Sequence, residues 1–171
     1  MKLEIRPADS SDLRAVHDVH VKAFNGRQDE AKLVDLLHAA NKAGPSLVVV
    51  DDGRVVAHVV FSPMTFEPVQ PRLRVVGLGP VAVLPDHQRR GIGTRLIEAG
   101  IELCRENGID AIAVLGGSAF YARFGFQPAK QYGLISVYGD SHFMLLELKP
   151  GALANVTGLI NYAPEFAAAG C

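Results

Sequence analysis

The stretch VAVLPDHQRRGIGT at Val81–Thr94 joins an apolar strand to the start of a helix through a short loop. Its first four residues are apolar, Pro85 ends that run, and a strongly amphipathic helix begins at Gly91. The first N–H groups of a helix have no acceptor within it and lie at the positive end of its dipole. Gly91 and Gly93 leave the main chain open to close approach by a ligand. The stretch therefore predicts a phosphate-binding loop.

The segments before this stretch predict a strand, two helices and a hairpin. A short first strand is expected at Lys2–Arg6, and apolar residues at helical spacing predict helices over Leu13–Phe24 and Glu30–Ala40. Two β-branched runs, Leu47–Val50 and Val55–Phe61, flank an Asp-Asp-Gly turn. That pattern is typical of an antiparallel hairpin.

The segments around and after the stretch alternate between strands and helices. Val75–Leu84 predicts a strand that opens near Gly79-Pro80, because proline cannot complete a ladder. The helix from Gly91 is expected to end at Asn107-Gly108. Strands are then expected at Ile109–Leu115 and His142–Leu148, with a short helix between them. The alternation predicts one layered α/β domain.

The composition is that of an ordinary globular protein of 171 residues. We expect the α/β domain to occupy residues 1–150 and a tail at 151–171 to dock on it. A net charge of −1 and the absence of tryptophan argue against nucleic-acid binding, and no apolar run approaches the roughly twenty residues of a membrane span. No secretory signal begins the sequence, which predicts a cytoplasmic protein with Cys104 and Cys171 as free thiols.

Other motifs are incomplete. Gly77, Gly79 and Ala82 imitate a dinucleotide fingerprint but lead into a strand rather than a helix. The sequence contains neither a phosphate-binding loop of the Walker type nor a complete nucleophile elbow. His17 and His20 are three residues apart, but no convincing cluster of cysteines or carboxylates accompanies them. We therefore expect no metal site.

Two motifs resemble those of the GNAT acetyltransferase superfamily. Gln88, Gly91 and Gly93 match its Gln/Arg-x-x-Gly-x-Gly/Ala motif after a valine-rich strand. Tyr121 precedes Gly125-Phe126 as in the Tyr-x-x-x-Gly-Phe element of the family. The resemblance covers about residues 1–148, and two short runs, at 57–63 and 78–83, also resemble a bacterial subgroup of predicted acetyltransferases, the YhbS type.

The resemblance implies a fold, a cosubstrate and a set of site residues. The fold would be a central mixed, largely antiparallel sheet, splayed at the cofactor strand and covered by helices on both faces. The cosubstrate would be acetyl-CoA. Its pantetheine would pair with Val81, Ala82 and Val83, and its pyrophosphate would be bound by the loop around Gln88, Arg89, Arg90, Gly91, Ile92, Gly93 and Thr94.

The resemblance also assigns a role to Tyr121, which would protonate the departing thiolate; the alternative is a packed aromatic residue. Direct attack by a neutral amine is expected, because Cys104 lies midway along its helix, where nothing lowers the pKa of the thiol. The general base stays open between His58, Glu67, His142 and water, since Val75–Val83 contains no ionisable residue.

The acceptor and the assembly also stay open. Acceptor specificity is expected from the loop between the first two helices and from the segments Phe61–Pro71 and Ala129–Ser141. A homodimer would form through an exposed strand edge or the apolar tail. The alternative function is a noncatalytic acyl-CoA-binding module that reports cofactor levels to a partner protein.

Overall fold

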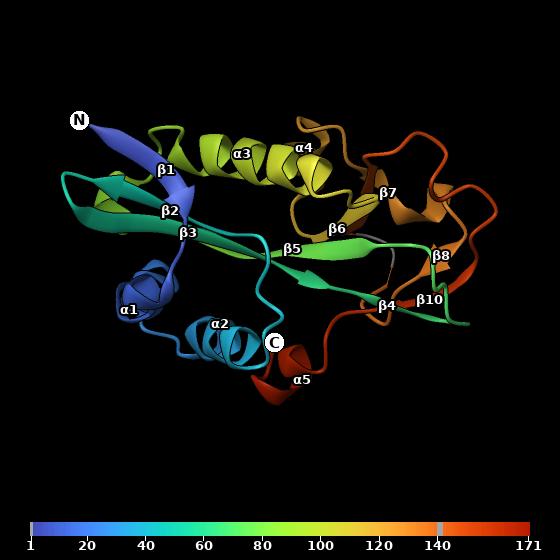
Figure 1. Cartoon of the computed structure of the whole chain (residues 1–171), viewed down its shortest axis with the longest axis horizontal. Coiled ribbons are helices and arrows are strands. Elements are labelled where there is room, and N and C mark those ends of the chain that lie inside the picture. Colours follow the sequence, from blue (N-terminus) through green and yellow to red (C-terminus); the bar gives the residue numbers. More distant parts are fainter. Residues whose placement is uncertain (1, 140–141) are drawn as a thin grey trace. The chain divides into compact units, whose positions relative to one another are not determined.

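The computed structural model describes residues 2–139 and 142–171, and the chain divides into two compact units (Figure 1). The first unit comprises Met1–Ser62, Gly79–Leu103 and Pro164–Cys171; the second comprises Pro63–Leu78 and Cys104–Ala163. Strand β5 (Val75–Val83) and helix α3 (Ile92–Glu106) each contribute to both. The last two residues of the expected acceptor segment, Asp140 and Ser141, lie outside the described residues, as does Met1.

The first unit contains the expected hairpin. Strand β1 (Leu3–Pro7) pairs antiparallel with β2 (Ser46–Asp51), and β2 pairs antiparallel with β3 (Arg54–Pro63). Asp52 and Gly53 both have positive φ, 49° and 79°, as the two central residues of a tight hairpin turn require. Strand β3 is buried on both faces over most of its length, so it carries the core of this unit.

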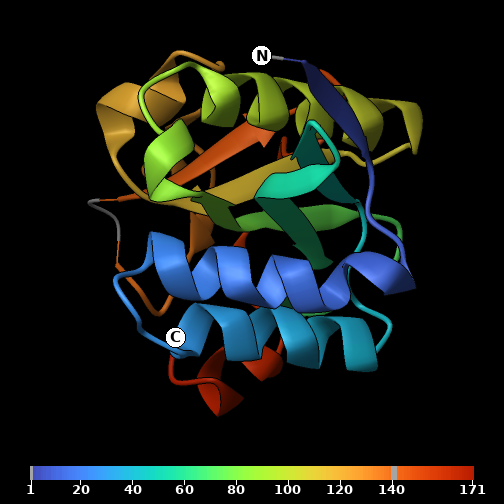
Figure 2. The ribbon, with the colours of Figure 1, turned by 90° about the vertical axis from the view of Figure 1, so that its left-hand side faces the viewer.

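Helices cover both faces of these strands. A single turn, η1 (Ser10–Asp12), is capped by the Asp9 side chain and leads into α1 (Leu13–Ala23), which packs beside α2 (Asp29–Ala39). Figure 2 shows α1 and α2 below strands β2 and β3 and α3 above them. The short α5 (Glu165–Ala168) packs on α2. Lys42 Nζ forms an ion pair with Glu165 Oε1 at 2.9 Å.

The second unit holds the remaining strands. The first half of β5 pairs parallel with β6 (Ala111–Leu115), and β9 (Phe143–Glu147) pairs antiparallel with both β6 and β7 (Gln127–Pro128). Helix α4 (Ser118–Ala122) follows β6, and the turn η3 (Ala129–Gln131) follows β7. A small sheet has the order β4 (Thr65–Glu67), β10 (Gly158–Asn161), β8 (Leu134–Ile135).

One buried cluster joins the two sheets of the second unit. It is built from apolar side chains of the strands β4, β5, β6, β8, β9 and β10, of the turn η3 and of the connecting segments: Met64, Phe66, Val75, Ala111, Ala113, Ala129, Leu134, Phe143, Leu145, Leu153 and Ile160. Ile160 is 1% exposed and belongs to the expected tail. The tail therefore supplies the middle strand of the small sheet, which its sequence did not predict.

The mixed, mostly antiparallel α/β fold is confirmed; among the described pairings, only β5–β6 and β10–β8 are parallel. Strand β5 runs without a break, and its ladder with β6 ends at Leu78 opposite Val114. The next residue, Gly79, has φ of 130°, a conformation rare for residues with a side chain. Within residues 2–139 and 142–171, no helix is long and apolar enough to cross a bilayer.

Candidate functional site

The loop between β5 and α3 is attached to the strands at its beginning and exposed where it approaches the helix. The Leu84 N–H donates to the Val56 carbonyl at 2.8 Å, and the turn η2 (Pro85–His87) follows. The Gln88 side chain donates to the Val83 carbonyl at 2.9 Å. Residues 88–91 are all exposed. The loop is therefore held to the strands by hydrogen bonds at its beginning and is exposed to solvent where it approaches the helix.

The start of α3 has the geometry of an anion site. The Arg95 N–H makes the first helical bond, to the Gly91 carbonyl, so the N–H groups at positions 92–94 have no acceptor within the helix. Arg89 and Gly91 have positive φ, 62° and 77°, which turns the main chain sharply. A Cβ at Gly91 would meet no atom within 4 Å. These donors therefore lie next to the open space at Gly91, at the positive end of the helix dipole.

Gly93 also leaves room, for a different reason. A Cβ there would lie 3.7 Å from Val83 Cγ2, an ordinary contact, so packing within the chain does not require glycine. Of the predicted pantetheine-binding residues, Val81 and Val83 are half-buried and Ala82 is 3% exposed. The structure thus brings together all of the predicted residues from Val81 to Thr94 in one strand, loop and helix start.

His87 is a loop residue that the sequence did not single out. It is 8% exposed, and its Nδ1 lies 2.8 Å from Asp86 Oδ1 while its Nε2 lies 2.8 Å from Asp51 Oδ2. The hydrogen bond with Asp86, and then that with Asp51, raises the pKa of His87 above its ordinary value. No local pattern predicts the contact with Asp51, which lies 36 positions earlier in the chain.

Tyr121 lies on α4 in the second unit and is 9% exposed. Its ring packs with Phe120 and Phe126 at centroid distances of 5.0 and 5.8 Å. Burial raises the pKa of the phenol, so Tyr121 is protonated at neutral pH and is able to donate a proton or a hydrogen bond. Both the catalytic and the packed-aromatic interpretations are consistent with this setting.

A second tyrosine near this position comes from the tail. A Cβ at Gly77 would lie 2.7 Å from Tyr162 Cε1, so the ring of Tyr162 lies directly on the β5 backbone. Burial raises the pKa of Tyr162, with smaller contributions from Tyr138 and Tyr121. The residue is nevertheless partly exposed. The sequence did not point to Tyr162, because the apolar residues of the tail show no periodicity that would predict which of its side chains are buried.

A shallow cavity of about 460 Å³, wide open to solvent, lies beside these aromatic residues in the second unit. Its lining residues are Leu115, Gly116, Gly117, Tyr138 and His142. Gly116 also adjoins Tyr121, since a Cβ there would lie 2.5 Å from Tyr121 Cε2. The cavity is therefore next to the predicted catalytic tyrosine.

The three candidate bases have different surroundings. His142 is exposed and lines this cavity, and Glu67 is exposed on β4. His58 is 0% exposed; its Nδ1 lies 2.8 Å from His20 Nε2 and its Nε2 lies 2.8 Å from Ser46 Oγ. Burial, followed by the proximity of His20, holds the pKa of His58 well below its ordinary value. Both ring nitrogens of His58 are occupied within the protein interior.

The two cysteines are free, as expected. Cys104 is fully buried, and burial raises the pKa of its thiol to about 12, which opposes thiolate formation. Among the described residues, no group of three or more His, Cys, Asp or Glu side chains is arranged to hold a metal ion.

The comparisons with known proteins agree with the fold. Residues 4–129 match the family model described as an acetyltransferase (GNAT) domain. The chain therefore belongs to the GNAT acetyltransferase family and is an enzyme of the acetyltransferase class.

Two relatives from Escherichia coli K12 are similar in sequence. The uncharacterized N-acetyltransferase YjhQ is 38% identical over 124 residues, which is 70% of this chain and 67% of YjhQ. The uncharacterized N-acetyltransferase YhbS is 35% identical over 140 residues, which is 80% of this chain and 83% of YhbS.

Two solved structures are similar over almost the whole chain. E. coli YhbS in complex with CoA superposes with a TM-score of 0.91 at 31% identity, covering 98% of this chain and 93% of that one. A GNAT family acetyltransferase from Brucella melitensis in complex with acetyl-CoA superposes with a TM-score of 0.81 at 31% identity, covering 96% and 98%.

Proposed function

We propose that the protein transfers an acetyl group from acetyl-CoA to an amine by direct attack in a ternary complex. The observation that carries this proposal is the start of α3, where N–H groups without helical acceptors lie next to the open space at Gly91. A pyrophosphate is the kind of anion that such a site binds. The complexes of the similar YhbS and Brucella proteins with CoA and acetyl-CoA support the same cosubstrate.

In this proposal each predicted residue has one task. Main-chain groups of Val81–Val83 pair with pantetheine as an added strand, and the loop Gln88–Thr94 binds the pyrophosphate. A backbone N–H near Val81 stabilises the oxyanion that forms when the amine attacks the thioester carbon. The carbon–sulfur bond then breaks, and Tyr121 gives its proton to the thiolate.

The amine loses its proton to a base. His142 is the candidate that the structure favours, because it is exposed and lines the cavity beside Gly116, whereas His58 is enclosed. The buried, protonated Cys104 supports direct transfer rather than an acetyl-cysteine intermediate. A screen of primary amines that measures release of free CoA thiol would identify the acceptor.

The cosubstrate is tested by the variant Gly93→Val. A valine obstructs close approach of the pyrophosphate to the backbone, and loss of one charge-assisted hydrogen bond weakens binding about tenfold or more. Calorimetry with acetyl-CoA measures the dissociation constant. Glu98→Val is the matched control, since it puts the same side chain at an exposed position on the same helix. Equal affinities for Gly93→Val and the parent would contradict the assignment.

A further inference from the structure

His87 is held between two carboxylates, and this arrangement sets its protonation state. Nδ1 faces Asp86 Oδ1 and Nε2 faces Asp51 Oδ2, both at 2.8 Å. A carboxylate only accepts hydrogen bonds, and a neutral imidazole carries a single N–H. Both contacts are therefore hydrogen bonds only when both ring nitrogens are protonated, which makes His87 an imidazolium cation.

The charged groups around His87 come from three elements. Asp51 ends β2 and is 20% exposed in its side chain, so its bond to His87 is the more protected of the two. Asp86, on η2, is 62% exposed and also lies 3.5 Å from Arg54 at the start of β3. Arg54 and Asp51 are opposite each other in the backbone register of β2 and β3, next to the hairpin turn. His87 thus ties η2 to the β2–β3 hairpin.

The tie bears directly on the phosphate-binding loop. His87 is the last residue of η2, and Gln88 begins the exposed stretch that leads through Arg89 and Gly91 into α3. On the basis of the proposed function, we propose that His87 is a positioning residue that makes acetyl-CoA binding depend on pH. As an imidazolium it holds the loop in its binding conformation, and loss of one proton leaves the lone pair of one ring nitrogen facing a carboxylate, which weakens this arrangement.

The direction of the pH dependence follows from the two carboxylates. They raise the pKa of His87 above the ordinary histidine value of about 6.5. The ordering of the loop by His87 is therefore complete below about pH 6.5 and is lost as the pH rises through the raised pKa. Affinity for acetyl-CoA should fall as the solution becomes alkaline.

Calorimetric titration of acetyl-CoA at intervals from pH 6 to pH 9 tests the proposal. In the parent protein the affinity should fall about tenfold over the alkaline part of this range, the value of one charge-assisted hydrogen bond. His87→Gln should bind about tenfold more weakly at pH 7 and change little towards pH 9, because both N–H donors of its amide are on one nitrogen and cannot reach carboxylates that face opposite sides of the histidine ring. The parent and this variant should converge at high pH.

Two further variants distinguish the hydrogen bonds of His87 from effects of replacing any paired histidine. Asp51→Asn should bind well and lose the pH dependence, because its amide is able to accept from an imidazolium or donate to a neutral ring. His17→Gln is the matched control. His17 is a histidine of α1 paired with a single carboxylate, Asp35, so its replacement should leave the parent profile unchanged.

Titration of the histidine rings by NMR in the ligand-free protein gives an independent readout. His87 should lose its proton above the ordinary histidine pKa of about 6.5. A neutral His87 at pH 7, or a pH profile that His87→Gln leaves unaltered, would overturn the positioning role while acetyl-CoA binding stood. If the parent protein did not bind acetyl-CoA at any pH, the proposed function would be overturned as well.

Discussion

Tyr121 owes its position to the absence of a side chain at Gly116. A Cβ on Gly116 would lie 2.5 Å from the tyrosine ring, so only glycine lets the ring rest against the backbone before α4. Phe120, Phe124 and Phe126 surround the ring on its other sides. Burial keeps the phenol protonated, as a general acid must be before it acts.

The variant Tyr121→Phe separates catalysis from packing. It removes one hydroxyl and keeps the ring, so kcat should fall about a hundredfold or more at nearly constant affinity for acetyl-CoA. Steady-state rates with an acceptor from the amine screen measure the effect. An unchanged kcat in Tyr121→Phe would leave Tyr121 as a packed aromatic.

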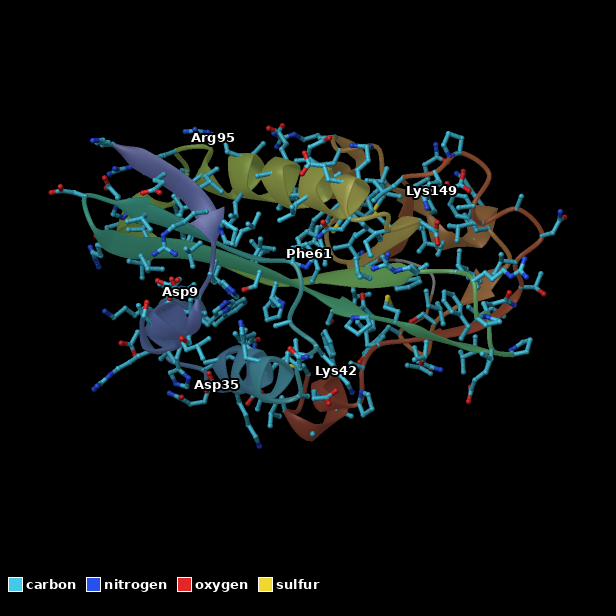
Figure 3. All side chains as sticks on the ribbon, in the orientation of Figure 1. Asp9, Asp35, Lys42, Phe61, Arg95 and Lys149 are labelled. Atoms are coloured by element: carbon cyan, nitrogen blue, oxygen red, sulfur yellow. The ribbon has the colours of Figure 1, made fainter. Side chains whose placement is uncertain are left out.

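At the scale of elements, α3 and β3 approach each other closely. A Cβ on Gly100 of α3 would lie 2.5 Å from Phe61 Cε2, and Phe61 is fully buried. Figure 3 shows Phe61 between the strand and this helix. Because α3 also presents the predicted phosphate-binding N–H groups, its distance from the sheet affects the position of the loop.

Alanine substitutions on this helix should have opposite effects. Gly100→Ala should lower the free energy of unfolding by about 1–3 kcal/mol, since overpacking against Phe61 outweighs the helix propensity of about 1 kcal/mol gained. Gly93→Ala meets only an ordinary contact with Val83 and should leave stability unchanged or higher. Urea denaturation measures both. Equal stability of the two variants would mean that α3 does not need glycine at Gly100.

At the scale of the whole molecule, the buried histidines His20 and His58 make stability depend on pH. Both are 0% exposed and 2.8 Å apart. Burial, then the nearby His17 and His38, lowers the pKa of His20 to about 4. The neighbouring hydroxyl of Ser46 offers His58 a hydrogen bond but no negative charge. Both histidines therefore fold as neutral rings.

The protein should therefore lose stability in acid. The unfolded chain takes up a proton on His20 near pH 6.5, whereas the folded chain does so near pH 4, so the stabilisation is complete above 6.5 and is lost as the pH falls towards 4. His20 alone should reduce the free energy of unfolding by about 3 kcal/mol over this range. Urea denaturation at several pH values measures the slope.

The variant His20→Phe tests whether His20 causes this dependence of the free energy of unfolding on pH. Phenylalanine keeps an aromatic ring beside Phe24, which stacks on His20 at 6.2 Å, but it binds no proton. The dependence of stability on pH should become shallower by about one proton, or 1.4 kcal/mol per pH unit, between pH 6 and pH 4. A slope equal to that of the parent would show that His20 is not the source of the acid sensitivity.

Local sequence was enough to predict the loop and the hairpin. The loop depends on neighbouring residues: a proline that ends a strand, glycines at Gly91 and Gly93, and helix N–H groups that no helix is able to satisfy internally. The hairpin depends on two β-branched runs and a turn of Asp52 and Gly53, whose positive φ angles are confirmed. Tyr121 was predicted by its fixed spacing from Gly125, and its role stays a prediction.

Sequence by itself determined the longer strands and helices, though not the short strands β4, β8 and β10, and it determined that the chain has the motifs of the GNAT family. Those properties reside in short runs of residues. Only the tertiary structure put His87 against Asp51, Phe61 against Gly100 and Tyr162 against Gly77. Such pairs come from distant parts of the chain. Their contact depends on strand register and on the space left where a glycine lacks a side chain, which no local pattern specifies.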